Sequence, residues 1–375
     1  MPRKTTAVYQ SDLENAVYDL VRVGSTGFAS GVSQIASRMI RTVPADVSDP
    51  ESFRANLHAS LKKASNATGL RFAGAQIPTD DVTASQLVEV NPLPIGDHLV
   101  LNEREQSVLE DVILERRHEE KLTRAGIPLT RTIMLTGAPG VGKSLAARWI
   151  AEKLELPLVT MSLSATVSSH LGTSGKNVKA VFDYAQSGPC VLFIDEFDAI
   201  AKNRDDETDI GELKRIVNVV LMELDRWPAS TLLLAATNHD HLLDPAIRRR
   251  FDTLVRFGLP DRNVRAQLIK QLASSHSLPQ PFLEALAKAL DDATGSDIER
   301  LWNAASRRSV LHEIPLEETL GEEACRFAVE NERPEDSYAL LSEQLGWSNR
   351  RIATLVGVTH PTVASALKKI EKIDD

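Results

Sequence analysis

The stretch LTGAPGVGKSLAARW, residues 135–149, places three glycines and one lysine between an apolar run and a helical pattern. Residues 137–144 fit the spacing G-x-x-x-x-G-K-[ST] without a gap. Glycines let the backbone curl so that successive N–H groups converge on phosphate oxygens, and the following helix adds its positive dipole end. The predicted phosphate-binding residues are Gly137, Ala138, Pro139, Gly140, Val141, Gly142, Lys143 and Ser144. The alternative is a glycine-rich turn without a ligand, which the strand before it and the helix after it disfavour.

Within this loop the lysine and the serine have separate expected roles. Lys143 is expected to reach the β- and γ-phosphates of a nucleotide, and Ser144 to hold Mg²⁺.

A second motif, CVLFIDEFD (190–198), delivers two acids at the end of an apolar run. Desolvated carboxylates are costly unless a cation or hydrogen bonds compensate them. We predict that Asp195 binds Mg²⁺, directly or through water, and that Glu196 orients and deprotonates an attacking water. A strand that simply ends at the surface in acidic residues is the alternative.

Short apolar runs alternate with helical patterns between residues 132 and 260. This alternation predicts an α/β fold, a P-loop NTPase parallel sheet with helices on both faces. After Pro260 the strands stop and only helical spacing remains, which predicts a small all-helical lid. Residues 1–95 show mostly helical patterns.

Composition excludes several classes of protein. The 375 residues carry a net charge of −9, which argues against a basic nucleic-acid coat. Two cysteines, Cys190 and Cys325, are too few for a disulfide scaffold. No apolar run is long enough to cross a bilayer and the start shows no secretory signal, so we expect a cytoplasmic protein without a membrane partner.

Two further stretches, LLLAATN (232–238) and LDPAIRRRFD (243–252), follow in order. With the preceding motifs they make residues 100–312 resemble the AAA+ ATPases, in the branch that carries the second region of homology, bacterial stand-alone type. The resemblance implies ATP and Mg²⁺ as ligands. It also implies that Asn238 is the sensor 1 residue that positions the water near the γ-phosphate.

The same resemblance places an arginine finger among Arg248, Arg249 and Arg250, in a segment shorter than the family's usual spacing. We favour Arg249 and Arg250. Three arginines that only solvate a helix end are the alternative. A finger donated to a neighbour implies a homo-oligomeric ring, expected to be a hexamer.

The stretch TGSDIERLWNAASRR (294–308) resembles the start of the sensor 2 helix, so Gly295 and Ser296 are expected near the adenine and ribose. Ser296 also fits a helix N-cap with Glu299 at the third helical position. The remaining adenine contacts are open, with Ile127 and Leu129 as weak candidates.

By resemblance, the expected domains are 1–95, a helical N-terminal domain of unassigned role that could recognise a substrate or partner; 96–260, the large ATPase subdomain; 261–335, the lid; and 336–375, a helix-turn-helix-like segment. At the pore-loop position the family's aromatic residue is replaced in His170-Leu171-Gly172, which disfavours strong threading of a polypeptide. Residues 201–212 are acidic and would repel a DNA backbone from a pore.

The stretch NRRIATLVGVTHPTVASALK (349–368) follows the helix-turn-helix pattern. Ala353 fits the helix crossing, Gly357 the left-handed turn and Val363 the contact back from the second helix. Residues 348–372 carry a formal charge of +4, which favours DNA as the partner. Packing against the lid or a protein is the alternative. The residues offered to base edges are Thr359, His360, Thr362 and Ser365.

Three functions remain open at this point. The first is a ring ATPase that remodels protein or protein–DNA assemblies. The second is a polypeptide unfoldase that feeds a separate protease, since the chain contains neither an HExxH nor a GxSxG motif of its own. The third is a nucleotide-gated DNA-binding switch. The first two functions imply a protein client.

Overall fold

The computed structural model describes residues 39–40, 43–44, 47, 49–57, 77–80, 83–91, 99–163, 174–199, 210–273 and 276–371. They divide into two compact units. The first contains Leu109–Thr136 and Ser144–Val255 with the described residues before 99. The second contains Leu99–Val108, Gly137–Lys143 and the residues from Arg256 onward. The predicted pore residues 170–172, the acidic residues 201–209 and most of residues 1–95 lie outside the described residues.

A six-stranded sheet forms the centre of the fold, in the order β1-β3-β4-β5-β2-β6. Three neighbouring pairs, β3 with β4, β4 with β5 and β2 with β5, are parallel. The predicted α/β fold is therefore confirmed. The strands are β1 (Glu89–Asn91), β2 (Thr132–Gly137), β3 (Leu158–Ser162), β4 (Val191–Asp195), β5 (Leu232–Thr237) and β6 (Thr253–Phe257).

One strand, β1, was not expected from the helical patterns before residue 95. It pairs antiparallel with β3 at the edge of the sheet. The segment before it is anchored by Asp80, which is 1% exposed and accepts a 2.6 Å hydrogen bond from the Asn177 side chain. A buried carboxylate held this closely fixes the segment to the sheet's edge.

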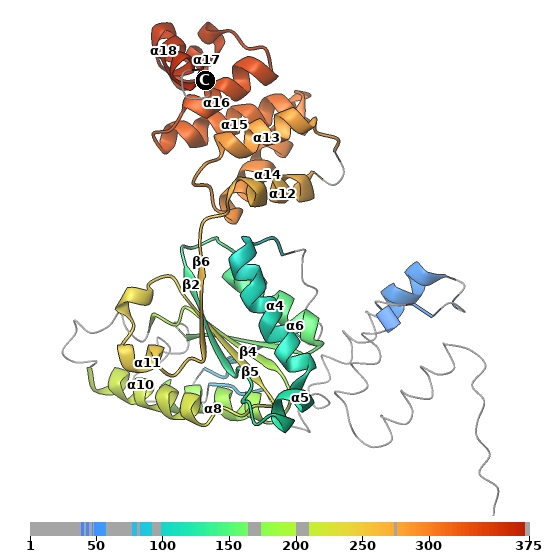
Figure 1. The fold of residues 1–375 in the computed structure, drawn as a ribbon, viewed down its shortest axis with the longest axis vertical. Coiled ribbons are helices and arrows are strands. Elements are labelled where there is room, and N and C mark those ends of the chain that lie inside the picture. The colour runs from blue at the N-terminus through green and yellow to red at the C-terminus, as the bar shows by residue number, and fades with distance from the viewer. Residues whose placement is uncertain are drawn as a thin grey trace, which may run out of the picture. The chain divides into compact units, whose positions relative to one another are not determined.

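Helices cover both faces of the sheet, with α8 and α10 on one side and α4 and α6 on the other (Figure 1). Side chains alternate between the faces along each strand, and the central strands are buried on both, as parallel strands require. The helices and short turns here are α4 (Glu103–Arg117), α5 (Glu119–Arg124), α6 (Lys143–Leu154), α8 (Ser174–Gln186), α10 (Ile210–Asp225), η1 (Asp240–Leu242) and α11 (Pro245–Arg248).

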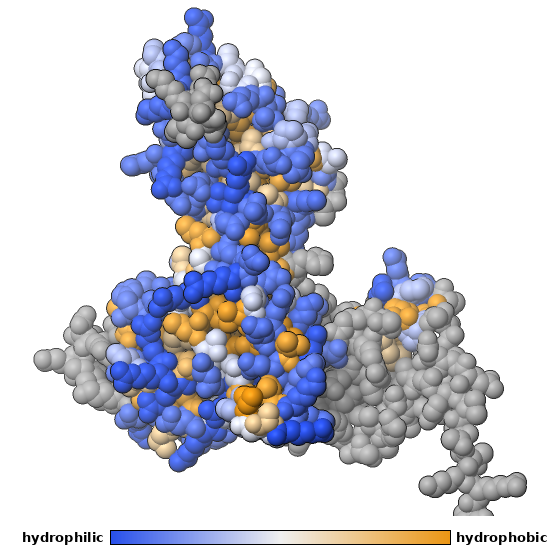
Figure 2. Space-filling view, viewed as in Figure 1, coloured by the Kyte–Doolittle hydropathy of each residue, from blue (hydrophilic) through white to orange (hydrophobic). Residues whose placement is uncertain are grey.

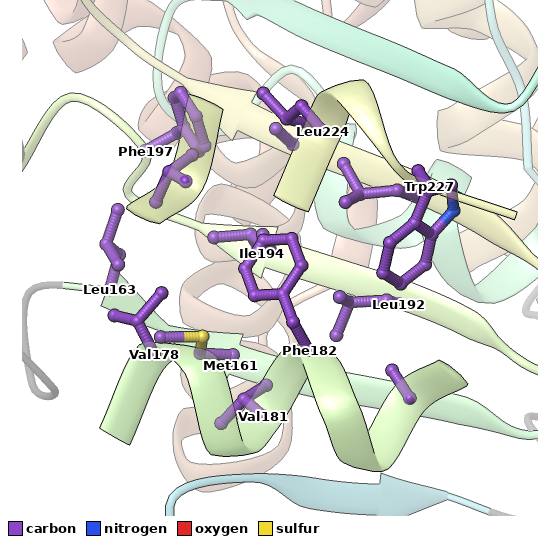
Figure 3. Close-up of a cluster of buried hydrophobic side chains, with 14 of the residues drawn as sticks. Met161, Leu163, Val178, Val181, Phe182, Leu192, Ile194, Phe197, Leu224 and Trp227 are labelled. Carbon is purple, nitrogen blue, oxygen red and sulfur yellow. The ribbon is translucent and has the colours of Figure 1, made fainter. Parts of the chain in front are cut away.

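The core on the α8 and α10 side is built around two aromatic residues (Figure 3). Phe182 of α8 and Trp227 are fully or almost fully buried, and their rings meet edge to face with centroids 5.6 Å apart. Leu192 and Ile194 of β4 pack in the same cluster. This packing holds β4, the strand that ends in the predicted acids, against two helices.

Arg116 holds the end of the sheet at which β2 and β5 begin. Its guanidinium donates to the backbone carbonyls of Thr130, Ala229 and Thr231 at 2.7, 2.6 and 3.1 Å. Burial lowers the pKa of Arg116, and nearby acids oppose that shift. Arg116 thus ties α4 to the segments that enter β2 and β5.

The second unit is helical from Arg262 onward, which agrees with the predicted loss of strands after residue 260. It contains two apolar clusters, and Leu345 packs against both. Its elements are α12 (Arg262–Leu272), α13 (Gln280–Ala289), α14 (Gly295–His312), α15 (Leu316–Glu330), α16 (Glu335–Ala339), η2 (Leu340–Gln344), α17 (Asn349–Val356) and α18 (His360–Glu371).

At one position in this unit a glycine leaves room for two leucine side chains. A Cβ added to Gly321 of α15 would lie 2.8 Å from a methyl carbon of Leu345 and 2.9 Å from one of Leu341. Leu341 is fully buried. The C-terminal helices are therefore packed into the lid, and the domain boundary after residue 335 stays a prediction.

Among the described residues, none of the helices combines the length and the apolar character needed to cross a lipid bilayer.

The aromatic core generates a stability prediction. Trp227→Ala should lower the free energy of unfolding by about 3–5 kcal/mol, because it removes a large buried side chain and leaves a cavity. The control is Trp149→Ala, a partly exposed tryptophan of α6 whose ring lies under Lys153. Urea titration followed by circular dichroism measures both, and equal losses would contradict this account of the core.

Candidate active site

The loop between β2 and α6 has a backbone that requires glycine at two points. Gly137 and Gly140 have φ angles of +149° and +80°. A Cβ on Gly137 would lie 2.4 Å from the carbonyl oxygen of Phe257. A Cβ on Gly140 would lie 2.9 Å from side-chain atoms of Ser296 and Thr294. The two glycines are therefore fixed by both conformation and space.

Lys143 closes the loop on itself. Its ammonium donates 2.8 Å hydrogen bonds to the carbonyl oxygens of Gly137 and Ala138, and the residue is only 8% exposed. A buried ammonium requires such acceptors. Both acceptors are neutral, so neither cancels its charge, and the positive group is held at the phosphate-binding loop.

The carboxyl end of β4 places a hydroxyl and two acids together. Ser144 Oγ lies 3.4 Å from Asp195 Oδ2, in hydrogen-bond contact. Both oxygens are of the kind that Mg²⁺ prefers, so the pair fits the predicted metal role. The next acid, Glu196, is exposed and accepts a 3.3 Å hydrogen bond from Ser162 Oγ.

Glu196 has a strained backbone. Its φ of +52° lies in the left-handed region, which costs a residue other than glycine about 1–3 kcal/mol. Its N–H donates to Asp195 Oδ1 at 2.8 Å, and the N–H of the next residue, Phe197, donates to Ala236 O at 2.8 Å. Phe197 is fully buried. The turn is thus held by its neighbours, and it presents the Glu196 carboxylate at the end of the sheet.

Sequence reasoning missed a second buried anchor. Asp198 is 2% exposed and accepts a 3.0 Å hydrogen bond from Thr237 Oγ1, which itself accepts one from His239 N–H at 3.0 Å. These contacts fix the chain on either side of Asn238, which is itself exposed. The ends of neighbouring parallel strands β4 and β5 therefore deliver Glu196 and Asn238 to the same edge of the sheet.

The three predicted finger arginines have different surroundings. Arg248 pairs with Asp240 at 3.5 Å. Arg250 pairs with Asp225 at 2.9 Å and also donates to the carbonyl of Ala246 at 2.9 Å. Arg249 is exposed, and its side chain has no hydrogen bond or ion pair with the described part of the chain. The two favoured arginines therefore differ. Arg250 is bound to groups of its own chain, whereas Arg249 has no side-chain partner in the described part of the chain.

In the second unit, the N-terminus of α14 contacts the loop. The N–H of Ser296 donates to Gly140 O at 3.2 Å, and a Cβ on Gly295 would lie 3.3 Å from the same oxygen. The predicted N-cap is wrong: Thr294 caps the helix in a reciprocal pair with Asp297, rather than Ser296 with Glu299. Ser296 is therefore a first-turn residue placed against the loop.

A short charged stretch supplies further contacts that the sequence did not reveal. Asn102 accepts from Asp261 N–H at 3.0 Å and donates to Leu259 O at 3.2 Å. Glu105, 7% exposed, accepts from Gly258 N–H at 3.0 Å. These side chains clip the segment between β6 and α12, and in the sequence they read only as a charged helix face.

Of the weak adenine candidates, Ile127 is 53% exposed and Leu129 is buried. Both belong to the first unit, whereas Leu101, which lies 3.9 Å from a Cβ built on Gly142, belongs to the second with the loop.

Residues 133–259 match the family described as ATPase family associated with various cellular activities (AAA). An AAA family ATPase of Sinorhizobium fredii, y4kL, is 32% identical over 303 residues, which cover 77% of this chain and 91% of the relative.

Other relatives carry names that include a function. ATP-dependent zinc metalloprotease FtsH 3 of Sphaerobacter thermophilus is 35% identical over 61% of this chain, and the match spans 47% of that protein. A proteasome-activating nucleotidase of Methanococcus vannielii is 29% identical over 70% of this chain and 67% of its own length.

The crystal structure of the FIGL-1 AAA domain has the same fold, with a TM-score of 0.54 at 24% identity over 66% of this chain and 89% of that one. The chain belongs to the AAA family of ATPases and binds and hydrolyses ATP.

Proposed function

We propose that this ATPase works as a homo-oligomeric ring, expected to be a hexamer, that uses ATP hydrolysis to remodel protein or protein–DNA assemblies. One observation carries the shared-site part of the proposal. Arg249 is exposed and unpaired within the described chain, while Arg248 and Arg250 are held by carboxylates of the same chain. An arginine that its own chain leaves uncommitted is suited to complete the site of a second copy.

Within one chain, the loop and its lysine bind the phosphates. The N–H groups of residues 137, 138 and 140–143 and the ammonium of Lys143 supply donors and positive charge where phosphate oxygens would be held. Gly295 and Ser296, which contact the loop, are proposed to border the ribose and adenine.

Ser144 and Asp195 would hold Mg²⁺, which neutralises developing charge on the phosphates when it is bound. Glu196 would accept the proton of the attacking water, and Asn238 would orient that water. The strained turn fixes the Glu196 carboxylate before the substrate arrives, so little rearrangement is needed in the reaction.

An unfoldase that serves a separate protease is the second candidate, because several relatives carry protease-associated names. The given residues contain no HExxH motif.

The first prediction concerns the general base. Glu196→Gln should lower ATP turnover by about 10²–10⁴-fold while nucleotide binding persists, because the amide cannot take a proton. Glu155→Gln is the matched control, since Glu155 is also exposed and also has a positive φ, +59°. Turnover and binding of a fluorescent ATP analogue are measured together. Wild-type turnover in the Glu196→Gln enzyme would contradict the assignment of Glu196 as the general base.

The second prediction concerns the shared site. Arg249→Ala should lower turnover by roughly a thousandfold or more, without loss of stability, because a finger stabilises transition-state charge. Arg250→Ala should instead lower stability, because it breaks the contacts with Asp225 and Ala246.

Mixing subunits tests whether Arg249 acts across an interface. Lys143→Ala subunits, which lack nucleotide binding, should restore turnover to Arg249→Ala subunits, because each variant supplies what the other lacks. Mixtures that stay as inactive as the separate variants would contradict donation between copies.

The remodelling proposal has its own test, with two reporters and ATP: a folded fluorescent protein with an unstructured extension, and a DNA duplex carrying a bound protein. We expect release of the bound protein by the wild type and none by Glu196→Gln. Unfolding of the free reporter alone would favour the protease-partnered unfoldase. Turnover that only changes the ATPase's own DNA affinity would favour the nucleotide-gated switch.

A further inference from the structure

The last two helices, α17 and α18, are joined by a short turn and share one apolar cluster. Ser348 caps α17, and Gly357 ends it in the left-handed conformation with φ of +72°. The N–H of Val358 then returns to Ala353 O at 3.1 Å. Val363 of α18 is fully buried and Ala353 is 6% exposed, in one apolar cluster. The two helices are therefore held in one fixed arrangement.

One face of α18 remains exposed, and its residues other than Pro361 are polar or basic. Positions 361, 362, 365, 368 and 369 are exposed, whereas Val363 and Ala366 point into the cluster. That spacing is one helical stripe. Residues 348–370 contain no Asp or Glu, and the visible surface of the C-terminal helices is mainly hydrophilic (Figure 2).

Some cations of this region are paired with groups of the described chain, and others are not. Arg351 stacks on the Trp347 ring, 3.4 Å from its centroid, and pairs with Glu318 at 2.9 Å. Arg350 and Lys368 are exposed, and neither side chain has a partner within the described chain. Lys369 is intermediate, because its ammonium lies 4.0 Å from a carboxylate oxygen of Glu335.

Asp336 of α16 lies outside this stripe and pairs with Lys288 at 3.0 Å. Glu343 of η2 is exposed. The stripe itself thus has two hydroxyls, those of Thr362 and Ser365, and one cation, Lys368, without a partner in the described chain. These groups complement a polyanion with hydrogen-bonding edges.

We propose that α18 is a reading helix for duplex DNA that enters the major groove. A helix about 10–12 Å in diameter matches a groove about 12 Å wide. Thr362 and Ser365 on the exposed stripe face the base edges, with His360 at the start of the helix. Arg350 and Lys368 contact phosphates. A-form RNA has a narrow, deep major groove and is not a ligand of this surface.

The reading helix is built into the lid and is not carried on a tether. Leu341 belongs to the apolar cluster under α17 and α18, and Leu345 packs against both clusters of the unit. The segment after α15 leads directly into α16, in which Ser337 and Tyr338 are buried. Truncation before α16 would therefore expose the lid's core, so point substitutions are the cleaner test.

Duplex DNA is thus a proposed partner of the ATPase. This inference rests on the proposed function only for the remodelling of protein–DNA assemblies. The experiment measures anisotropy of a labelled mixed-sequence DNA duplex with the full chain, over a range of salt concentrations, beside an RNA duplex of the same sequence. ATP turnover is measured on the same samples, so loss of DNA binding and loss of catalysis are read separately.

Wild-type protein should bind DNA with a steep salt dependence and bind RNA much more weakly. Arg350→Ala and Lys368→Ala should each make the slope of log K against log salt shallower by about 0.9, because each removes one phosphate contact. Arg307→Ala, an exposed arginine of α14, is the control and should leave the slope unchanged. Ser365→Ala should weaken sequence preference in a selection from randomised duplexes while leaving the salt slope intact.

The proposal is overturned if the duplex does not bind at low salt, or if RNA binds as tightly as DNA. It is also overturned if the double variant Arg350→Ala/Lys368→Ala keeps the slope of the Arg307→Ala control. Normal ATP turnover with any of these results would leave the ATPase assignment standing.

Discussion

The tight curl of the loop between β2 and α6 is the constraint on which the rest of the structure depends. Gly137 lies against the backbone of Phe257 and Gly140 against the start of α14, so neither position has room for a side chain. The same loop directs its lysine inward and begins the helix that carries Ser144. A single backbone path therefore sets the donors proposed for phosphate, the hydroxyl proposed for Mg²⁺ and the contact with the start of α14.

The carboxylate proposed as the general base depends on stability supplied elsewhere. The left-handed backbone at Glu196 is unfavourable by itself, and it persists because the next residue is locked into the sheet. Behind it, the buried pair of Asp198 and Thr237 joins the ends of β4 and β5. The aromatic cluster around Phe182 and Trp227 holds β4 from below. Catalytic geometry at the strand ends is thus a product of burial several residues away.

The sheet, the phosphate loop and the paired acids could be predicted because buried parallel strands read as apolar runs and the loop chemistry leaves a fixed glycine spacing. The cap of α14 could not be, since Thr294 and Ser296 are both good N-caps with an acid three residues on, and only packing against the loop decides between them. The strand β1 is three residues long and carries little pattern. The availability of Arg249 depends on ion pairs between residues far apart in sequence, such as Arg250 with Asp225, which no local pattern contains.

Gly321 has a consequence for how this lid can be varied. The space beside the backbone of α15 at this position is filled by side-chain carbons of Leu341 and Leu345. A methyl group there would displace these two side chains, which pack in the cluster that holds α17 and α18. Variation at position 321 would therefore act first on the packing beneath the last two helices.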